Sequence, residues 1–388
     1  MPLRRTKKND KIKQGYKFLA LPNKDQEVKF SKTFGCVRKY WNIAKSDSIE
    51  NYKNNKTFVI NSPHFYKEKE EYSYLKEVDS LALCNAQTNL NTAYTNFFQK
   101  KGGYPSFKSK SDKQSYTTNN QISKNGIHSI YLIRENGKDY IKLPKIGLVE
   151  IKRHRKVTGL IKNVTITKAK SGKYYVSIMC EQEVKLPDIK IDASSIDALD
   201  YKSDGLYTDI NGCCDMPHFY KVSQKDLVKY QKQLSKKVKG SNNYKKQKSR
   251  LAKFSEYVSN QRKDFLHKQS TKITNLYDIV VVEDINLKEI ASSKSKYHLG
   301  KATNDNGYGM FISMLEYKLQ RKGGILIKAD KFYPSSQLCS SCNFQNKDIK
   351  NLSIRKWTCP CCGTQHDRDE NAVKNLINYG HNYIKDKY

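Results

Sequence analysis

The sequence predicts two domains of different fold class, an α+β domain over residues 1–190 and an α/β domain over residues 191–388. Two observations indicate this division. Between residues 130 and 180, short apolar-rich runs alternate with Gly-containing turns, as in antiparallel sheets. The run 279–282 is entirely apolar, and a helical pattern and a second apolar run follow it, which is typical of a strand–helix–strand unit in a parallel sheet. A chain of 388 residues is also too long for one compact domain.

The first domain is expected to combine a small antiparallel barrel with a long helix. Strands are predicted at 130–133, 140–143, 149–151, 164–166 and 174–179. Turn sequences containing Asn-Gly or Ser-Gly separate several of them, which favours antiparallel pairing. From residue 78 to residue 98, apolar residues recur at helical spacing, and Asp79 or Ser80 is placed to cap this helix.

The second domain is expected to begin with a hairpin of strands 195–200 and 206–210, with the turn residues Asn211 and Gly212 after them. Two helices should follow between residues 224 and 271, with a break at 240–243. After the central strand, a helix over 308–322, a strand over 325–327 and a last helix from Glu370 complete the α/β pattern.

The charge of the chain points to nucleic acid. It has 72 Lys and Arg against 38 Asp and Glu, a net charge of +34 at pH 7. Such an excess repels itself unless it lies against a polyanion. Residues 225–272, in the predicted helical pair, contain 15 Lys and Arg against 3 acids. A solvated helical hairpin is the simpler interpretation, but this ratio favours a surface that faces phosphates.

The sequence predicts neither a membrane span nor a secreted protein. No run approaches the ~18 apolar residues of a span, and the basic N-terminus lacks the apolar segment of a secretory signal. Five of the ten Cys fall between residues 339 and 362, a distribution unlike a disulfide framework and typical of a metal site in a reducing compartment. We therefore expect a cytoplasmic protein with no membrane partner.

Cys339, Cys342, Cys359 and Cys362 form two C-x-x-C pairs separated by 16 residues. Four thiolates at this spacing can close tetrahedrally on Zn²⁺, and because no position is left for water the site would be structural. Cys361 lies between two of these ligands and is expected to point away. A different choice of ligands, or thiols without metal, are the alternatives.

Three acids fall on separate predicted elements: Asp200 on the first strand, Glu283 after the central strand, and Asp369 at the start of the last helix. Carboxylates are the hard oxygen ligands that Mg²⁺ prefers. Two such ions about 4 Å apart can activate a water and stabilise the leaving oxygen of a phosphodiester. Each acid also has a plain structural interpretation. Asp369 could cap its helix, Glu283 could pair with a lysine, and Asp197 rivals Asp200.

Several short motifs follow one another along nearly the whole chain. They are DYKSDGLYTDING at 200–212, RKDFLHK at 262–268, VEDIN at 282–286, FYPSSQLC at 332–339 and HDRDENA at 366–372, with YKF at 16–18, PNKDQ at 22–26, KTFG at 32–35 and YPSFK at 104–108 nearer the N-terminus. These motifs resemble those of the TnpB proteins of insertion-sequence transposons. Because they are independent and occur in the same order, the chain is identified as a member of that family.

The resemblance implies an RNA-guided DNA endonuclease related to the miniature type V CRISPR effectors. Residues 1–190 would form a wedge-like β-barrel with a helical recognition insert at about 31–110. Residues 191–388 would form a RuvC-like nuclease of RNase H fold, with the basic helical hairpin at 224–271 and a zinc ribbon at about 336–365. A guide RNA from the transposon end would pair with one strand of double-stranded target DNA beside a short flanking motif, in the service of transposon maintenance. We expect one chain per RNA.

Carried over by motif, Asp200, Glu283 and Asp369 are the catalytic acids and bind two Mg²⁺ ions, with Asp367 as the alternative third acid. The chain departs from the family pattern in two places. Many members have Gly on either side of the first acid, where this chain has Leu199 and Tyr201. Asn343 follows the second knuckle Cys where Gly is usual, which would strain the knuckle.

If base pairing with the guide selects the target sequence, the protein needs many cations that face the nucleic-acid backbone and few residues that contact bases. The residues expected to face phosphates are Lys236, Lys237, Lys245, Lys246 and Arg262. The candidates for the flanking motif are Gln87, Lys108 and Thr118, since Gln can bond adenine in the major groove. For any one of these three, an ordinary exposed polar position is the simpler interpretation.

Two other functions stay open from the sequence. One is an RNA-guided DNA-binding repressor without cleavage, and the other is a transposase that joins DNA ends by itself. The presence of all three acids and all four Cys favours the nuclease.

Overall fold

The computed structural model describes residues 10–184, 195–292, 300–351 and 353–387. The chain divides into two compact units at the boundary between Val184 and Lys185. The boundary predicted between residues 190 and 191 lies outside the described residues. Within those described ranges, no helix is long and apolar enough to cross a membrane.

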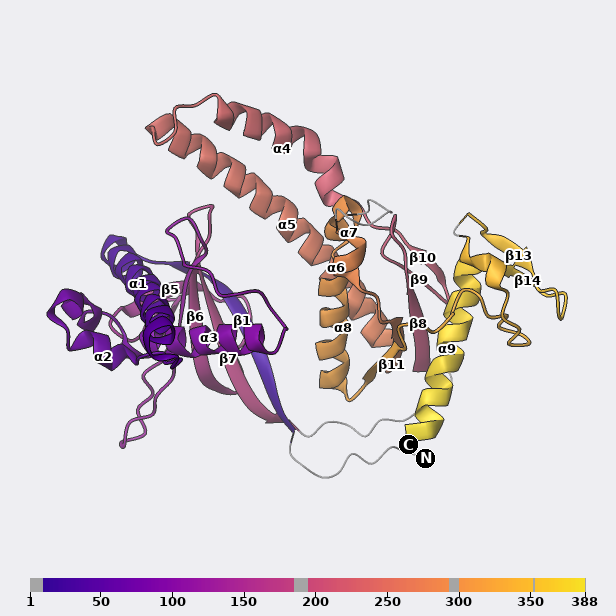
Figure 1. Cartoon of the computed structure of the whole chain (residues 1–388), viewed down its shortest axis with the longest axis horizontal. Helices are drawn as coiled ribbons and strands as arrows, with labels where there is room; N and C mark the ends of the chain where they lie inside the picture. Colours follow the sequence, from indigo (N-terminus) through magenta and orange to yellow (C-terminus); the bar gives the residue numbers. More distant parts are fainter. Residues whose placement is uncertain (1–9, 185–194, 293–299, 352, 388) are drawn as a thin grey trace. The chain divides into compact units, whose positions relative to one another are not determined.

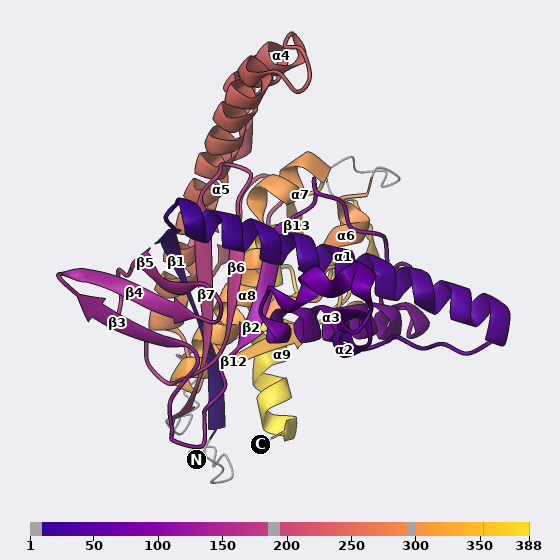
Figure 2. The ribbon, with the colours of Figure 1, turned by 90° about the vertical axis from the view of Figure 1, so that its left-hand side faces the viewer.

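The first unit is a sheet with helices on one side. Its strands are β1 (Asp10–Leu21), β2 (Gln114–Asn119), β3 (Tyr131–Glu135), β4 (Lys138–Leu143), β5 (Gly147–Lys152), β6 (Leu160–Lys168) and β7 (Tyr174–Val184). Its helices are α1 (Lys24–Asn55), α2 (Pro63–Lys67), the 3₁₀ helix η1 (Glu70–Lys76) and α3 (Ser80–Phe98). Helices α1 and α3 lie side by side and both contact β2 (Figure 2). The five predicted strands are confirmed, as is the predicted helix with its Asp79 cap.

The seven strands pair in the order β2-β6-β7-β1-β5-β4-β3. Strands β2 and β3 stand at the two ends of this row, and no pairing joins them among the described residues. The sheet is therefore open there, and the predicted closed barrel is not found. Strand β1 lies within the row, between β7 and β5, although the sequence pattern did not reveal it. Its buried residues alternate, but polar Gln14 and the neighbouring Gly15 interrupt the apolar pattern.

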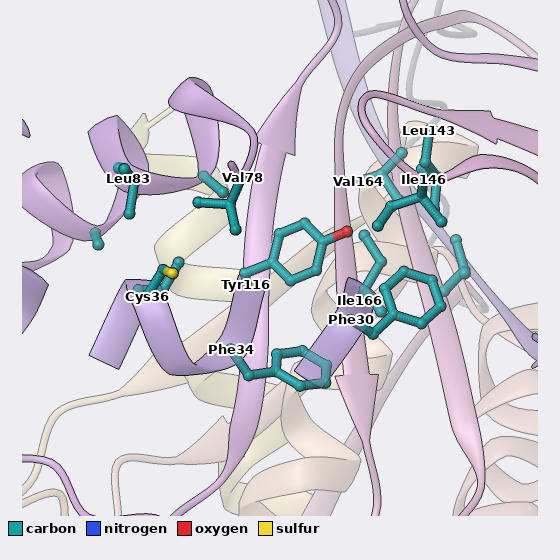
Figure 3. Close-up of a cluster of buried hydrophobic side chains, with 14 of the residues drawn as sticks. Phe30, Phe34, Cys36, Val78, Leu83, Tyr116, Leu143, Ile146, Val164 and Ile166 are labelled. Atoms are coloured by element: carbon teal, nitrogen blue, oxygen red, sulfur yellow. The ribbon is translucent and has the colours of Figure 1, made fainter. Parts of the chain in front are cut away.

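The core of the first unit is rich in aromatic residues. Helix α1 begins with a capping box, in which Asn23 Oδ1 accepts the Gln26 N–H at 2.8 Å and the Asn23 N–H donates to Gln26 Oε1 at 3.1 Å. One and two turns later, Phe30 and Phe34 lie with their ring centroids 6.4 and 5.7 Å from that of Tyr116 on β2 (Figure 3). Burial of each such ring contributes about 1.5–3 kcal/mol, so these contacts hold the helix on the sheet.

The second unit is an α/β sheet with a small inserted hairpin. Its main strands are β8 (Ile196–Tyr201), β9 (Tyr207–Asp209), β10 (Gly212–Cys214), β11 (Ile279–Glu283) and β12 (Ile325–Ala329). Its helices are α4 (Phe219–Ser235), α5 (Asn242–Leu276), α6 (Leu287–Ile290), α7 (Gly300–Asn306), α8 (Tyr308–Lys322) and α9 (Arg368–Lys387). The insert contains the 3₁₀ helix η3 (Lys347–Lys350), β13 (Lys356–Thr358) and β14 (Gln365–Asp367). The predicted hairpin, helical pair and strand–helix–strand unit are confirmed.

The sheet of the second unit has the order β10-β9-β8-β11-β12, and β11 is parallel to both β8 and β12. Successive side chains of a strand point to opposite faces. Ala198 and Val281 share a buried cluster with α9, whereas Leu199 and Val282 share one with α5 and α8. Figure 1 shows α8 and α9 on opposite sides of these strands. Burial on both faces explains why the run 279–282 is apolar throughout.

Helices α4 and α5 form an arm that extends away from the five-stranded sheet (Figures 1 and 2). The start of α4 has no side-chain cap from its own segment. Instead, the carboxylate of Asp305 on α7 accepts the backbone N–H groups of Tyr220 and Lys221 at 3.0 and 3.2 Å. The same carboxylate pairs with Arg262 of α5 at 3.1 Å. Asp305 therefore joins both helices of the arm to the body of the unit.

Strand β8 carries a buried acid, Asp197. Its Oδ1 accepts the backbone N–H groups of Ala198 and Ile210 at 2.7 and 3.4 Å, while its Oδ2 has no hydrogen-bond partner among the described residues. Burial, and to a smaller extent the charge of Asp209, raises the pKa of Asp197 from 3.8 to about 6. The folded protein therefore holds this proton more tightly than the unfolded chain. The resulting stability is present below about pH 4 and is lost as the pH rises through 6.

We expect the substitution Asp197→Asn to stabilise the protein in a pH-dependent way. At pH 7.5 the free energy of unfolding of the variant should exceed that of the wild type by about 2 kcal/mol, because the variant no longer buries a charge. Near pH 4 the two proteins should be nearly equal, since Asp197 is then neutral when folded. Urea unfolding at both pH values measures this difference. A stability difference between the two proteins that stays constant across pH would contradict the raised pKa of Asp197.

Candidate functional site

The four predicted zinc ligands converge in the insert. The Sγ atoms of Cys339, Cys342, Cys359 and Cys362 all lie within 4.8 Å of one another, and the pairs 339–362 and 342–359 are each 3.6 Å apart. A tetrahedral Zn²⁺ with Zn–S bonds of about 2.3 Å places its sulfurs about 3.8 Å apart. The four atoms therefore fit this ion. Cys361 is exposed and outside the group, as predicted.

Both C-x-x-C turns end in the left-handed region of backbone space, at Asn343 with φ 62° and Gly363 with φ 72°. Their N–H groups donate to the carbonyls of Cys339 and Cys359 at 2.8 and 2.9 Å. Among residues with a side chain, Asn adopts this region at little cost. The strain expected from Asn at this position is therefore small.

The three predicted acids line one cavity of about 550 Å³. One register step beyond the last parallel pair of β8 and β11, Glu283 lies beside Asp200 at the carboxyl end of the sheet. Both project from the face that α9 covers, as do Ala198 and Val281 two residues before them. Asp369, in the first turn of α9, lines the same cavity, as does a fourth acid, Asp204. Residues from three elements far apart in the sequence thus meet in one place.

Asp367 and Asp369 have different roles in the structure. Asp367 Oδ1 accepts the backbone N–H groups of Asp369 and Glu370 at 3.0 and 3.3 Å. These are the bonds of a residue that caps a helix N-terminus. The carboxylate of Asp369 instead lines the cavity with the other two acids. The capping role considered for Asp369 therefore belongs to Asp367.

The acids are electrostatically strained when no cation is present. Burial raises the pKa of Asp200 well above its usual range, and the charges of Glu283 and Asp369 raise it further. Burial also raises the pKa of Glu283, while a hydrogen bond from the Ser335 hydroxyl and the charge of Arg368 oppose the increase. A cation in the cavity would relieve both carboxylates.

Two arginines balance part of this negative charge. Arg368 is buried, and its charge lowers the pKa of both Asp200 and Glu283. Its guanidinium is anchored by a 2.9 Å hydrogen bond to the Asn351 carbonyl. Arg355 forms an ion pair with Asp369, with Nη1 and Oδ1 3.3 Å apart. Both arginines line the acidic cavity.

Two buried amides of α9 tie the cysteine turns to the acids. Asn371 and Asn375 donate to the Leu338 carbonyl at 2.6 and 2.7 Å, and Asn375 also donates to the Ser335 carbonyl at 2.7 Å. Ser335 in turn donates its hydroxyl to Glu283. The segment that leads into the first C-x-x-C turn is thereby fixed between α9 and the acidic cavity.

Several residues that line or support the cavity were not predicted, among them Ser335, Arg355, Arg368, Asn371 and Asn375. Ser335, Arg368 and Asn371 lie inside the motifs 332–339 and 366–372, so membership of a motif was the available signal. Arg355 and Asn375 lie outside these motifs, and no pattern in the sequence marks them.

The candidates for the flanking DNA motif have different environments. Thr118 is fully buried and its hydroxyl donates to Asp79, so it cannot reach a base, and this prediction is wrong. Gln87 is partly exposed, and its amide donates to a backbone carbonyl at 3.4 Å. Lys108 lies with Nζ 3.5 Å from the ring centroid of Trp41, and burial lowers its pKa.

The arm separates its predicted cations into two groups. Those exposed around the turn between α4 and α5 are Lys236, Lys237, Lys245 and Lys246. Arg262 lies at the base of the arm, where its side chain is only 20% exposed and pairs with Asp305. Arg262 thus lies apart from the lysines at the tip, and its contact with nucleic acid stays a prediction.

Models of three known families match parts of the chain. They are described as "Cas12f1-like, TNB domain" over residues 308–376, "Probable transposase" over 205–294 and "Helix-turn-helix domain" over 12–57. A protein of Streptomyces pristinaespiralis named "Putative RNA-guided DNA endonuclease" is 30% identical over 375 residues, which cover 95% of this chain and 90% of that protein. The Escherichia coli K12 protein "Putative RNA-guided DNA endonuclease InsQ" is 30% identical over 386 residues, which cover 95% and 92%.

A solved structure has the same fold. It is described as "Cryo-EM structure of the Cas12f1-sgRNA-target DNA complex" and aligns with a TM-score of 0.59 over 96% of this chain and 99% of that chain, at 13% identity. The chain is therefore a protein with a mixed α/β fold similar to that of this structure, and it carries a four-cysteine group that could hold zinc. More specifically, the chain belongs to the TnpB family, as the motifs indicated.

Proposed function

We propose that this protein is an RNA-guided DNA endonuclease, which hydrolyses phosphodiester bonds of target DNA beside a short flanking motif. In this proposal Asp200, Glu283 and Asp369 are the metal-binding catalytic acids. The proposal rests on one observation: these carboxylates, which come from β8, β11 and α9, line the same cavity. The names of relatives that match nearly the whole chain support the same reaction.

The acidic cavity fits Mg²⁺ by its chemistry. Its acids offer only oxygen ligands, and burial together with the charges of Glu283 and Asp369 raises the pKa of Asp200, which a bound cation would oppose. Two such ions could share the carboxylates of this cavity. When bound, Mg²⁺ would supply an activated water and neutralise charge on the scissile phosphate.

Side chains of this protein would prepare the cavity for the ions and the DNA. Ser335 fixes the orientation of Glu283 through its hydroxyl. Arg368 offsets the charge of the acids from a buried, anchored position. Arg355 is 66% exposed and holds Asp369, so it is placed to exchange this carboxylate for a phosphate oxygen of the DNA. Arg355 would thereby bring the phosphate to the acids.

The finer fold assignment belongs to the same proposal. Residues 191–388 would be a RuvC-like nuclease of RNase H fold, because the antiparallel β9–β10 hairpin extends three parallel strands that carry two of the acids. The cysteine insert at about 336–365 would be its zinc ribbon. Residues 1–190 would be the wedge domain, with α1 to α3 as the recognition insert at about 31–110.

The proposed partners are a guide RNA from the transposon end and double-stranded target DNA. The exposed lysines at the tip of the arm form no ion pair with an acid of the described residues and suit phosphates of either nucleic acid. We propose one protein chain per RNA, acting in the cytoplasm, where cysteines stay reduced. Cleavage of DNA from which the transposon has left would serve its maintenance.

The test is a cleavage assay with the RNA that co-purifies with the protein, after that RNA has been sequenced. In Mg²⁺, DNA that carries the complement of the guide beside the flanking motif should be cut on both strands, and EDTA should prevent the cut. Binding of matched DNA without a cut would indicate the repressor instead. Joined DNA ends that form without RNA would indicate the transposase, and either result would contradict the proposal.

A further inference from the structure

We propose that Phe98, Tyr104 and Phe107 of the first unit form a platform on which unpaired bases of the guide RNA stack. This inference rests on the proposed function in one respect, since it takes the guide RNA as a partner. It assigns a role to residues that are distant in sequence from the catalytic acids and that the nuclease chemistry does not use.

The three rings are exposed, although two of them, Phe98 and Tyr104, belong to an organised aromatic group. Phe98, Tyr104 and Phe107 are 61%, 51% and 54% exposed. Phe97 contacts both Phe98 and Tyr104, with ring centroids 5.5 and 5.1 Å away. Buried Tyr94 supports Tyr104 from beneath, at 5.7 Å and a nearly perpendicular angle of 84°. Phe107 lies next to this group through Lys45, whose Nζ is 5.1 Å from the Tyr104 centroid and 3.6 Å from that of Phe107. Exposed apolar rings gathered in this way often mark an interaction site.

The backbone around Phe107 is fixed even though its ring is exposed. The loop from α3 to β2 has no regular structure near this residue. Helix α1 holds it on both sides: the Trp41 indole N–H donates to the Ser106 carbonyl at 3.0 Å, and Asn42 exchanges two hydrogen bonds with the Lys108 backbone at 2.8 and 2.9 Å. An aromatic ring on a fixed backbone binds with little ordering cost.

The charge around the platform complements a polyanion. Residues 99–113 contain five Lys and a single acid, Asp112. Four of these five, Lys100, Lys101, Lys110 and Lys113, are exposed and can reach phosphates. Lys45 is buried with its Nζ 3.6 Å from the centroid of the Phe107 ring, and Lys108 lies over Trp41. Aromatic faces flanked by cations are the arrangement with which proteins hold single-stranded nucleic acid, because the rings stack on bases while the cations neutralise phosphates.

The same observations favour RNA over a second copy of the chain. Self-association through this surface would bring two lysine-rich loops together, and like charges oppose such contacts. An exposed apolar patch is a liability while it is uncovered, so these rings favour a partner that is always bound. The guide RNA would be bound before any target is found, whereas target DNA offers unpaired bases only after its duplex has opened.

The first test measures how the full chain, freed of RNA at high salt, binds a fluorescent twelve-nucleotide oligouridine. Phe107→Leu should weaken binding about tenfold, since stacking on one base is lost, and Phe107→Trp should restore it. An abasic ribose-phosphate chain of the same length should bind equally to all three proteins. Phe65→Leu, a substitution of a 46% exposed ring outside the platform, is the matched control and should bind like the wild type.

The second test identifies the occupant in the complete complex. Ultraviolet cross-linking before DNA is added should join the peptide that contains Tyr104 and Phe107 to the co-purified RNA. If this peptide cross-links only after target DNA has been added, and then to the DNA alone, the assignment to RNA is overturned. A change of molecular mass caused by Phe107→Leu would show that the surface joins two protein chains. A loss below twofold for oligouridine, or an equal loss for the abasic chain, would overturn stacking. If Asp200→Asn still cuts DNA while Phe107→Leu loses oligouridine, the proposed chemistry fails and the platform stands.

Discussion

Replacing Asp200 by Asn is expected to reduce target cleavage by about 10³-fold or more, because the loss of a shared metal ligand removes several kcal/mol of transition-state stabilisation. Binding of RNA and DNA should persist, since Asp200 lies within the cavity and not on the basic arm. The same change should raise the melting temperature of the metal-free protein by a few degrees, about 2–4 °C for each kcal/mol of relieved repulsion. The raised pKa of Asp200 is the physical reason, because the folded protein pays to keep this carboxylate charged.

Mg²⁺ provides a second readout of the same substitution. It should raise the melting temperature of the wild-type protein and have less effect on Asp200→Asn, because the ion binds the folded acids. Asp386→Asn removes an exposed carboxylate near the other end of α9 and should change neither cleavage nor the response to Mg²⁺. If Asp200→Asn cuts DNA as the wild type does, Asp200 is not a catalytic ligand.

Replacing Cys359 by Ser is the second change with a large expected effect. The protein should lose most of its zinc, which elemental analysis would show as a fall from one ion per chain towards none. Structural zinc sites stabilise their surroundings by many kcal/mol, so the insert should lose its fold. Cleavage should fall with it, because Asn371 and Asn375 tie the same segment to Ser335 and thus to Glu283.

Cys361 provides a matched control two residues away. It is exposed and lies outside the group of four sulfurs. Cys361→Ser should keep its zinc, its melting temperature and its cleavage activity. Equal loss of zinc in both variants would mean that the ligands have been assigned wrongly. Full cleavage by a zinc-free Cys359→Ser protein would show that the insert does not support the acids.

Much of the second unit could be predicted because local patterns and long-range packing agree there. The run 279–282 is apolar on both faces, which only a central strand requires, and the structure pairs it with β8 and β12. The cysteine spacing was equally informative, because four identical ligands leave few alternatives. Parallel pairing of β8 and β11 then sets the register that brings Glu283 beside Asp200. These two residues are too far apart in the sequence for a local pattern to show that they meet.

Features that depend on distant partners could not be predicted. Arg262 looks like any other cation of a basic helix, and its partner Asp305 lies on a helix further along the chain. Thr118 sits in a polar strand, but Asp79 on another element buries its hydroxyl. Whether the first sheet closes depends on how its edge strands pair, which the alternation within each strand does not specify.

The central claim is that three distant acids bind the same divalent ions, and anomalous scattering from Mn²⁺ tests it most directly. A crystal of the protein with its guide RNA, soaked in Mn²⁺ as a substitute for Mg²⁺, should show anomalous density in the cavity between Asp200, Glu283 and Asp369, and a crystal of Asp200→Asn should lose it. Density at other sites only, in a preparation that cuts its target, would contradict the account.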